Sequence, residues 1–229
     1  MQPTSHFGEV FQYSNLMASA AGNVGARLYD PKSDLGSADK TMQNLVFTHL
    51  GMSSTTFAMA RALKGNHASP HGDDVDVRPQ VADMAVNYSV MPHRPAGGVW
   101  TSAHDLAKYV QLEIARGKLP DGTRLVSEQN LLMRRQPQIA TGENQSYGMG
   151  LMEDKTWGVT VIHHGGSLAG FKSDLMFLTE YGIGAVLLTN SDNGGVLLRP
   201  MMRRLIKVLG PAQSLRNPLA LTSSDDQII

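Results

Sequence analysis

The sequence contains no cysteine, and this absence excludes several kinds of site at once. Without thiols the chain forms no disulfide, offers no thiolate nucleophile and has no cysteine ligands for zinc. Such a composition fits a reducing compartment but does not establish one. The sequence therefore leaves both a cytoplasmic and a periplasmic location of bacterial type open.

An excess of charge of one sign and a long hydrophobic run are also lacking. Twenty basic residues balance twenty acidic ones, and no segment concentrates lysine and arginine, so we expect no nucleic-acid partner. No apolar run reaches the roughly 18 residues that a membrane span needs. The first five residues have neither the basic nor the apolar region of a signal peptide. We expect no membrane span.

The spacing of apolar residues changes from helical to extended near residue 145. Helical spacing predicts five helices, over 15–28, 37–50, 102–117, 127–133 and 196–209. Short runs between turn residues predict strands over 147–152, 159–163, 173–178 and 183–189. Helices followed by strands indicate an α+β fold, with a mainly helical lobe (1–145), an antiparallel sheet plus a packing helix (146–210) and a tail (211–229).

Local signals set the ends of these elements. Serines at 37, 102 and 127 are expected to cap helices, with Asp105 reaching back to complete a capping box. Gly51 is expected to end the second helix. Hairpins are expected across 154–155 and 180–182. Residues 64–80 are expected to form a polar loop, and 81–95 an irregular or partly extended segment.

Two short patches carry most of the chemical information. Tyr13-Ser14-Asn15 precedes the first predicted helix, and His163-His164-Gly165-Gly166-Ser167 ends a predicted strand. A glycine in a strand lets another molecule approach the backbone closely. Adjacent histidines in a strand point to opposite faces, so they do not suit one metal ion. The histidines and aspartates of the polar loop are read as solvated, and we expect no metal and no cofactor.

These patches, together with Pro95-Ala96-Gly97-Gly98 and the Ser102–Leu106 stretch, resemble motifs of the serine β-lactamase-like hydrolases. That family includes class C β-lactamases, DD-peptidases and related esterases, and the resemblance covers residues 7–209. It implies a β-lactamase/transpeptidase-like fold. It also implies a role for five residues: Tyr13 as general base, Asn15 as positioning amide, His164 as substrate-side donor, Gly166 as the close-approach glycine and the Ser167 N–H as half of an oxyanion hole.

The nucleophile motif of that family, Ser-x-x-Lys, belongs upstream of the tyrosine, where only twelve residues stand. Ser37-Ala38-Asp39-Lys40 is the one match to its spacing, and residues at i and i+3 share a helix face. Its position after Tyr13 is wrong for the family, and capping is a sufficient role for Ser37. We therefore expect a chain that lacks the family's N-terminal segment, with its apolar neighbours covered by a homo-oligomer, a rearranged N-terminus or a second polypeptide.

The resemblance implies hydrolysis through an acyl-enzyme, with carboxylic esters favoured as substrates. Histidine in place of lysine at position 164 weakens recognition of a β-lactam carboxylate, so β-lactamase or DD-peptidase action on amides is the second expectation. A non-catalytic module that binds acyl or peptide ligands is the third. The expected partner is a small ester or amide.

Overall fold

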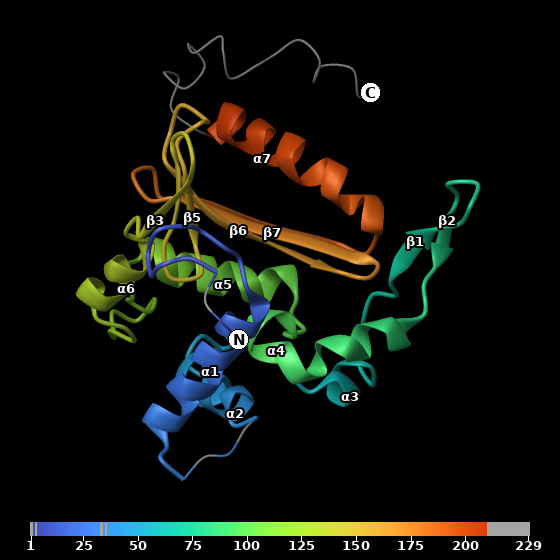
Figure 1. Cartoon of the computed structure of the whole chain (residues 1–229), viewed down its shortest axis with the longest axis horizontal. Coiled ribbons are helices and arrows are strands. Elements are labelled where there is room, and N and C mark those ends of the chain that lie inside the picture. The colour runs from blue at the N-terminus through green and yellow to red at the C-terminus, as the bar shows by residue number, and fades with distance from the viewer. Residues whose placement is uncertain (1, 3, 33, 35, 210–229) are drawn as a thin grey trace.

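The computed structural model describes residues 2, 4–32, 34 and 36–209. Its centre is a six-stranded antiparallel sheet in which strands adjacent in sequence are adjacent in space, in the order β3-β4-β5-β6-β7-β8 (Figure 1). The strands are β3 (Ile139–Gly142), β4 (Gln145–Tyr147), β5 (Met152–Asp154), β6 (Val161–Leu168), β7 (Phe171–Leu178) and β8 (Ile183–Thr189). The helices precede and follow this sheet, as the α+β prediction requires.

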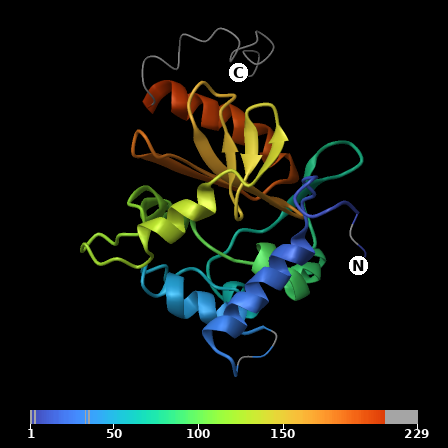
Figure 2. The same cartoon turned by 60° about the vertical axis from the view of Figure 1, so that its left-hand side comes forward.

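The two faces of the sheet are covered by different helices because side chains alternate along each strand. On one face, Val161 and Met176 pack with Met202 and Ile206 of α7 (Gly195–Leu209), which lies along the sheet in Figures 1 and 2. On the other, Ile162 and Phe177 pack with Val110 of α5 (Ala103–Ile114). The β6 residues that face α5 are therefore the even-numbered ones, a parity that decides where the site residues point.

The helical region begins with α1 (Asn15–Tyr29), α2 (Ala38–Met42) and a π-helical turn, η1 (Gln43–Phe47). Shorter elements follow: α3 (Met59–Ala62), a small hairpin of β1 (His71–Asp73) and β2 (Pro79–Val81), a 3₁₀ segment η2 (Met84–His93) and α4 (Arg94–Gly97). After α5 comes α6 (Glu128–Arg135), and a 3₁₀ turn, η3 (Asp192–Gly194), leads into α7. The boundary predicted at residue 145, between the helical lobe and the sheet with its packing helix, stays a prediction. The tail predicted over 211–229 lies outside the described residues.

Several local predictions are confirmed and several are wrong. Ser102 and Ser127 cap their helices by accepting from the N–H of Asp105 and Asn130, and Gly51 has the left-handed φ of a helix stop (61°). Ser37 makes no capping hydrogen bond, because its hydroxyl is engaged by Asp34.

The predicted strand over 147–152 is wrong, since β4 ends at Tyr147 and β5 starts at Met152 with a turn between them. The strand predicted over 159–163 begins at Val161 and runs on through the glycines to Leu168. The segment over 81–95 is mainly 3₁₀ and α-helical rather than extended, and the polar loop contains the β1–β2 hairpin. Both predicted hairpin pairings, β5 with β6 and β7 with β8, are confirmed.

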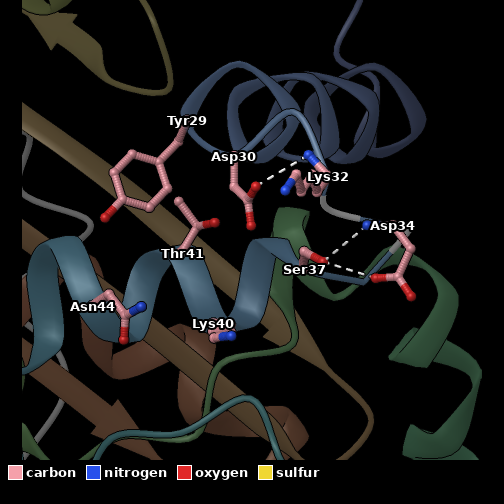
Figure 3. Close-up of a pocket in the computed structure, with 8 residues that line it drawn as sticks. All are labelled: Tyr29, Asp30, Lys32, Asp34, Ser37, Lys40, Thr41 and Asn44. Atoms are coloured by element: carbon pink, nitrogen blue, oxygen red, sulfur yellow. Dashed lines mark hydrogen bonds between the residues drawn. The ribbon is translucent and has the colours of Figure 1, made fainter.

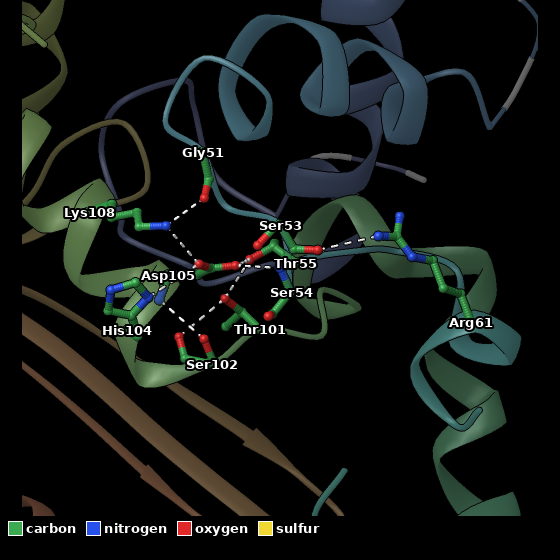
Figure 4. A network of polar contacts seen from close by, with 10 residues as sticks. All are labelled: Gly51, Ser53, Ser54, Thr55, Arg61, Thr101, Ser102, His104, Asp105 and Lys108. Atoms are coloured by element: carbon green, nitrogen blue, oxygen red, sulfur yellow. Dashed lines mark hydrogen bonds and ion pairs between the residues drawn. The ribbon is translucent and has the colours of Figure 1, made fainter. Parts of the chain in front are cut away.

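A buried carboxylate joins α5 to the loop after Gly51 (Figure 4). Asp105 is 1% exposed, and its Oδ2 accepts from the N–H of Ser54 (2.8 Å) and the hydroxyl of Thr55 (3.0 Å). Lys108 donates to its other oxygen at 3.2 Å. The carboxylate therefore does not reach back to Ser102, and the second half of the predicted capping box is wrong.

This network makes the stability of the fold depend on pH. Burial opposes ionisation of Asp105, but hydrogen bonds from Lys108, Ser54 and Thr55 outweigh it and hold the pKa of Asp105 below its usual value. A lowered pKa adds stability above the unfolded pKa near 4, and that stability is lost as the pH falls through the native pKa. We expect Asp105→Asn to destabilise the protein at pH 7 and progressively less towards pH 3, measured by urea unfolding at each pH. An equal loss at both pH values would contradict this account.

Candidate functional site

Two of the predicted site residues lie side by side although they are far apart in the sequence. Tyr13 stands just before α1, whose first turn is capped by the Ser14 hydroxyl accepting from the N–H of Met17. His164 lies on β6 and, by the parity of that strand, on the face towards α5. The centroids of the Tyr13 and His164 rings are 6.0 Å apart. Tyr13 is 53% exposed, so about half of this residue faces solvent.

A residue that the sequence did not single out, Tyr147, joins this pair. Its ring centroid lies 6.2 Å from that of Tyr13, 6.1 Å from that of His164 and 5.0 Å from that of Phe11. Its hydroxyl lies 3.2 Å from Nε2 of His164. The register brings the end of β4 close to this part of β6, since Tyr147 is opposite Met152 and Met152 is opposite His163. Paired residues share a face, so the ladder groups Tyr147 with His163, and its hydroxyl reaches His164 at the point where β4 ends and β5 has not yet begun.

The contacts of His164 determine its neutral tautomer. Nδ1 lies 2.7 Å from the carbonyl oxygen of Gly165, which only accepts hydrogen bonds, so Nδ1 carries the proton. In the neutral imidazole Nε2 is then an acceptor, and the Tyr147 hydroxyl donates to it. Both ring nitrogens are thus occupied, and the predicted donation from His164 to a substrate requires one of these contacts to open.

The two tyrosines of the site differ in the environment of their hydroxyls. Tyr147 is half-buried, and burial, reinforced by the nearby Tyr13, raises the pKa of the Tyr147 phenol above its ordinary value. Tyr147 therefore remains a neutral O–H donor at physiological pH. Tyr13 is the more exposed of the two.

Gly166 and Ser167 follow His164 on β6 and point to opposite faces. Gly166 shares the face of His164, and an added Cβ would lie 2.4 Å from the hydroxyl oxygen of Ser173 on β7. Ser167 directs its hydroxyl to the other face, where Lys172 donates to it at 2.9 Å and also pairs with Asp192 at 3.1 Å. Only the backbone of Ser167 is available on the Tyr13 side, and its oxyanion role stays a prediction.

The edge of β6 beyond His163 is open. β5 pairs with β6 only over 161–163, and within the described residues no strand pairs with that side of 164–168. Asn15 is exposed at the first position of α1, and its amide has no hydrogen bond to the described part of the chain. Its predicted role in positioning a substrate therefore rests on the motif alone.

Ser37 lies elsewhere, in a surface pocket of about 280 Å³ near the C-terminal end of α1 (Figure 3). Its hydroxyl donates to the carboxylate of Asp34 at 2.8 Å and accepts from the Asp34 N–H, and no hydrogen bond joins it to Lys40 among the contacts of the described residues. Tyr29 lines this pocket, at the opposite end of the 15-residue α1 from Tyr13. A helix of that length spans roughly 20 Å. The structure does not bring Ser37 to Tyr13 and His164.

The part of the chain that the structure describes contains no group of three or more histidine, aspartate or glutamate side chains placed to hold a metal ion. None of its helices is both long enough and apolar enough to span a bilayer.

Comparison with known proteins places the chain in a family. The family model described as Beta-lactamase matches residues 1–208. Penicillin-binding protein 4 of Amycolatopsis lactamdurans is 26% identical over 187 residues, which are 79% of this chain and 48% of that protein.

Solved structures agree in fold. The octameric penicillin-binding protein homologue from Pyrococcus abyssi has a TM-score of 0.73 at 22% sequence identity. The matched region covers 89% of this chain and 43% of the homologue's chain. A D-stereospecific amidohydrolase from Streptomyces has a TM-score of 0.66 at 20% sequence identity, and the matched region covers 93% of this chain and 58% of the amidohydrolase chain. The chain thus spans about half the length of these relatives. Because the family model matches nearly the whole chain, the protein belongs to the beta-lactamase family of serine hydrolases and penicillin-binding proteins.

Proposed function

We propose that this protein hydrolyses carboxylic esters through an acyl-enzyme, with Tyr13 as the general base. The observation that supports this most directly is the contact between the rings of Tyr13 and His164, two motif residues brought together by the fold. Tyr13 takes the proton of a serine hydroxyl as its oxygen attacks the ester carbonyl, and returns it to the departing alcohol oxygen. Water then cleaves the acyl-enzyme and releases the acid.

A phenol ordinarily ionises near pH 10, so a tyrosine base needs positive charge close by at neutral pH. The His164 imidazole beside the Tyr13 ring supplies such a charge in its cationic form, in which Nε2–H donates to the Tyr147 oxygen instead of accepting from it. The open edge of β6 offers backbone N–H groups to the carbonyl oxygen as negative charge develops on it. No serine hydroxyl of the described residues forms a hydrogen bond with Tyr13, Tyr147 or His164, so the attacking serine has to be identified by labelling.

Amide hydrolysis is the second candidate function, and the relatives favour it. Their names include a penicillin-binding protein and a D-stereospecific amidohydrolase. Esters and amides pass through analogous tetrahedral intermediates, and with an amide the tyrosine returns its proton to the leaving nitrogen instead of an oxygen. Hydrolysis rates measured side by side on p-nitrophenyl acetate, a chromogenic cephalosporin and a D-alanine p-nitroanilide separate the two proposals. The first substrate is an ester and the other two are amides.

Covalent labelling tests both. The folded protein is treated with a fluorophosphonate probe and, separately, with a fluorescent penicillin, and the modified residue is mapped by mass spectrometry. We expect one labelled serine, with labelling retained in Ser37→Ala because Ser37 lies away from Tyr13. A folded protein with neither label nor turnover of the three substrates would overturn the hydrolase proposal and favour a non-catalytic binding module.

Self-association through α1 is a further proposal. Met17, Val24 and Leu28 are 62%, 58% and 79% exposed, whereas the buried positions of this helix are the small residues Ser19 and Ala26. An apolar face of this kind marks a contact surface, and the Pyrococcus abyssi homologue is octameric. We expect light scattering to give a multiple of the mass of 24.8 kDa, reduced by Val24→Lys. A monomer across the micromolar range would contradict this proposal.

A further inference from the structure

Tyr147 is the centre of the aromatic cluster formed by Phe11, Tyr13, Tyr147 and His164. It contacts each of the other three rings, at centroid distances from 5.0 to 6.2 Å. It is also the member whose side chain forms a hydrogen bond to another ring of the cluster, through its hydroxyl and Nε2 of His164. A packing role would explain the ring contacts but does not require this hydroxyl to be directed at the imidazole.

We propose that Tyr147 is a positioning residue, whose hydroxyl holds the His164 imidazole in one tautomer and one ring orientation beside Tyr13. The inference rests on the proposed function, in which Tyr13 is the general base beside His164. Tyr147 contacts His164 and acts on the reaction only through that residue. The Tyr147 O–H and the Gly165 carbonyl engage the two ring nitrogens from opposite edges, 3.2 and 2.7 Å away. A half-turn of the ring would place carbon atoms against both partners and lose both hydrogen bonds.

The positions of the two tyrosines assign them different roles. The Tyr147 ring is half-buried between Phe11 and Tyr13, and its phenol stays protonated, so it donates a hydrogen bond without acting as a base. Tyr13 is exposed and free to exchange a proton with a ligand. A fixed ring orientation keeps the distance between Tyr13 and the imidazole constant in either protonation state, because the Tyr147 oxygen can donate to Nε2 or accept from it, and this lowers the reorganisation needed in each turnover.

The hydroxyl that contacts His164 comes from the last residue of a strand. β4 stops at Tyr147, and the turn over 148–151 separates it from β5, which begins at Met152 opposite His163. β5 pairs with β6 no further than His163, and the Tyr147 hydroxyl reaches Nε2 of His164 beyond the start of β5. The gap that exposes the edge of β6 to a ligand therefore also admits the residue that orients His164.

The test is the Tyr147→Phe variant, which keeps the ring contacts and removes the hydroxyl. The first measurement is the ¹⁵N spectrum of His164 in labelled protein, at alkaline pH where the imidazole is neutral. We expect wild type to show a protonated Nδ1 and an unprotonated, hydrogen-bonded Nε2. In Tyr147→Phe, the Nε2 resonance should move to the position of a nitrogen without a donor, or towards the average of two tautomers. An unchanged spectrum would overturn the proposal.

The second measurement is steady-state kinetics on p-nitrophenyl acetate. We expect kcat to fall about tenfold, the effect of losing one neutral hydrogen bond, with KM changed less than twofold. A changed spectrum with an unchanged kcat would also overturn the positioning role. Tyr88→Phe is the matched control, since Tyr88 is 52% exposed and among the described residues has no ring contact or hydrogen bond with this cluster. It should alter neither measurement.

The nitrogen spectrum needs no turnover, which separates this proposal from the proposed function. If wild type hydrolyses none of the substrates, the hydrolase proposal fails, while the spectra still decide whether Tyr147 holds His164. If Tyr147→Phe does not fold, the wild-type spectrum decides instead, because a protonated Nε2 would be incompatible with a hydroxyl donating to it.

Discussion

Tyr13→Phe should reduce ester hydrolysis by about 10²- to 10⁴-fold, the usual contribution of a general base. The phenylalanine ring keeps the contacts of Tyr13 with Tyr147 and His164, at centroid distances of 6.2 and 6.0 Å, and lacks only the oxygen that accepts the proton. Because Tyr13 is 53% exposed, the melting temperature should hardly change. The loss should appear mainly in kcat, since proton transfer contributes to the transition state rather than to substrate binding.

The control for this result is again Tyr88→Phe, because Tyr88 is exposed to nearly the same extent as Tyr13 and has no ring contact with the cluster among the described residues. A Tyr13→Phe enzyme that retains activity within threefold of wild type would remove Tyr13 from the reaction. A large loss accompanied by a lower melting temperature would instead show that Tyr13 acts through packing. Fluorophosphonate labelling of the variant adds a third readout, because acylation by the probe also requires activation of the serine.

Site residues and strand pairings could be predicted from the sequence where a few contiguous residues determine them. Tyr13 and His164 stand in short motifs, and the fold brings their rings together. The antiparallel pairing of β7 with β8 was predictable because Gly182 permits the left-handed turn between them, with φ of 63°. Such signals need only local spacing and one residue of special conformation.

Tyr147 could not be found in this way. Its contact with His164 depends on the register of three strands and on the point where β4 ends, and the sequence-based strand prediction placed Tyr147 at the start of a strand rather than at its end. The Ser37 cap failed for a related reason. The Ser37 hydroxyl accepts from the Asp34 N–H and donates to the Asp34 carboxylate, so it is not available to cap the helix. The sequence pattern does not show that these hydrogen bonds to the preceding turn form instead of the cap.

The largest loss of stability is expected at Glu113, a buried carboxylate on α5. It is 1% exposed and accepts from two arginines of α6: Arg134 donates to Oε1, and Arg135 donates to Oε2 through Nε at 3.1 Å and Nη2 at 2.8 Å. Arg134 also donates to the hydroxyl of Tyr109 at 2.9 Å, and the Arg135 guanidinium lies 4.9 Å from the centre of the Phe177 ring. One acidic group thus connects α5, α6 and the core of the sheet.

Glu113→Gln should lower the free energy of unfolding by about 3–5 kcal/mol, the cost of breaking a buried ion pair by removing one partner. Glutamine has nearly the same volume, so the loss comes from charge rather than from a cavity. It leaves two guanidinium groups close together, with Arg135 only 7% exposed at its side chain and far from the water that would otherwise stabilise it. Urea unfolding at pH 7 measures the change.

Glu128→Gln is the matched control, because Glu128 pairs with Arg116 at 3.0 Å at the surface with 41% of its side chain exposed. Water screens that pair, so its loss should hardly change the urea midpoint. Equal losses in the two variants would show that the buried network behaves as a surface pair.

A combined variant separates the two possible origins of the loss at Glu113. If an uncompensated buried charge is responsible, replacing Glu113, Arg134 and Arg135 together by Met, Leu and Leu should recover most of the stability lost in Glu113→Gln. If instead the directional hydrogen bonds between α5 and α6 hold α6 in place, the combined variant should be no more stable than the single one. The geometry favours recovery, since the Arg135 side chain already lies over the Phe177 ring in an apolar setting that leucine would fill.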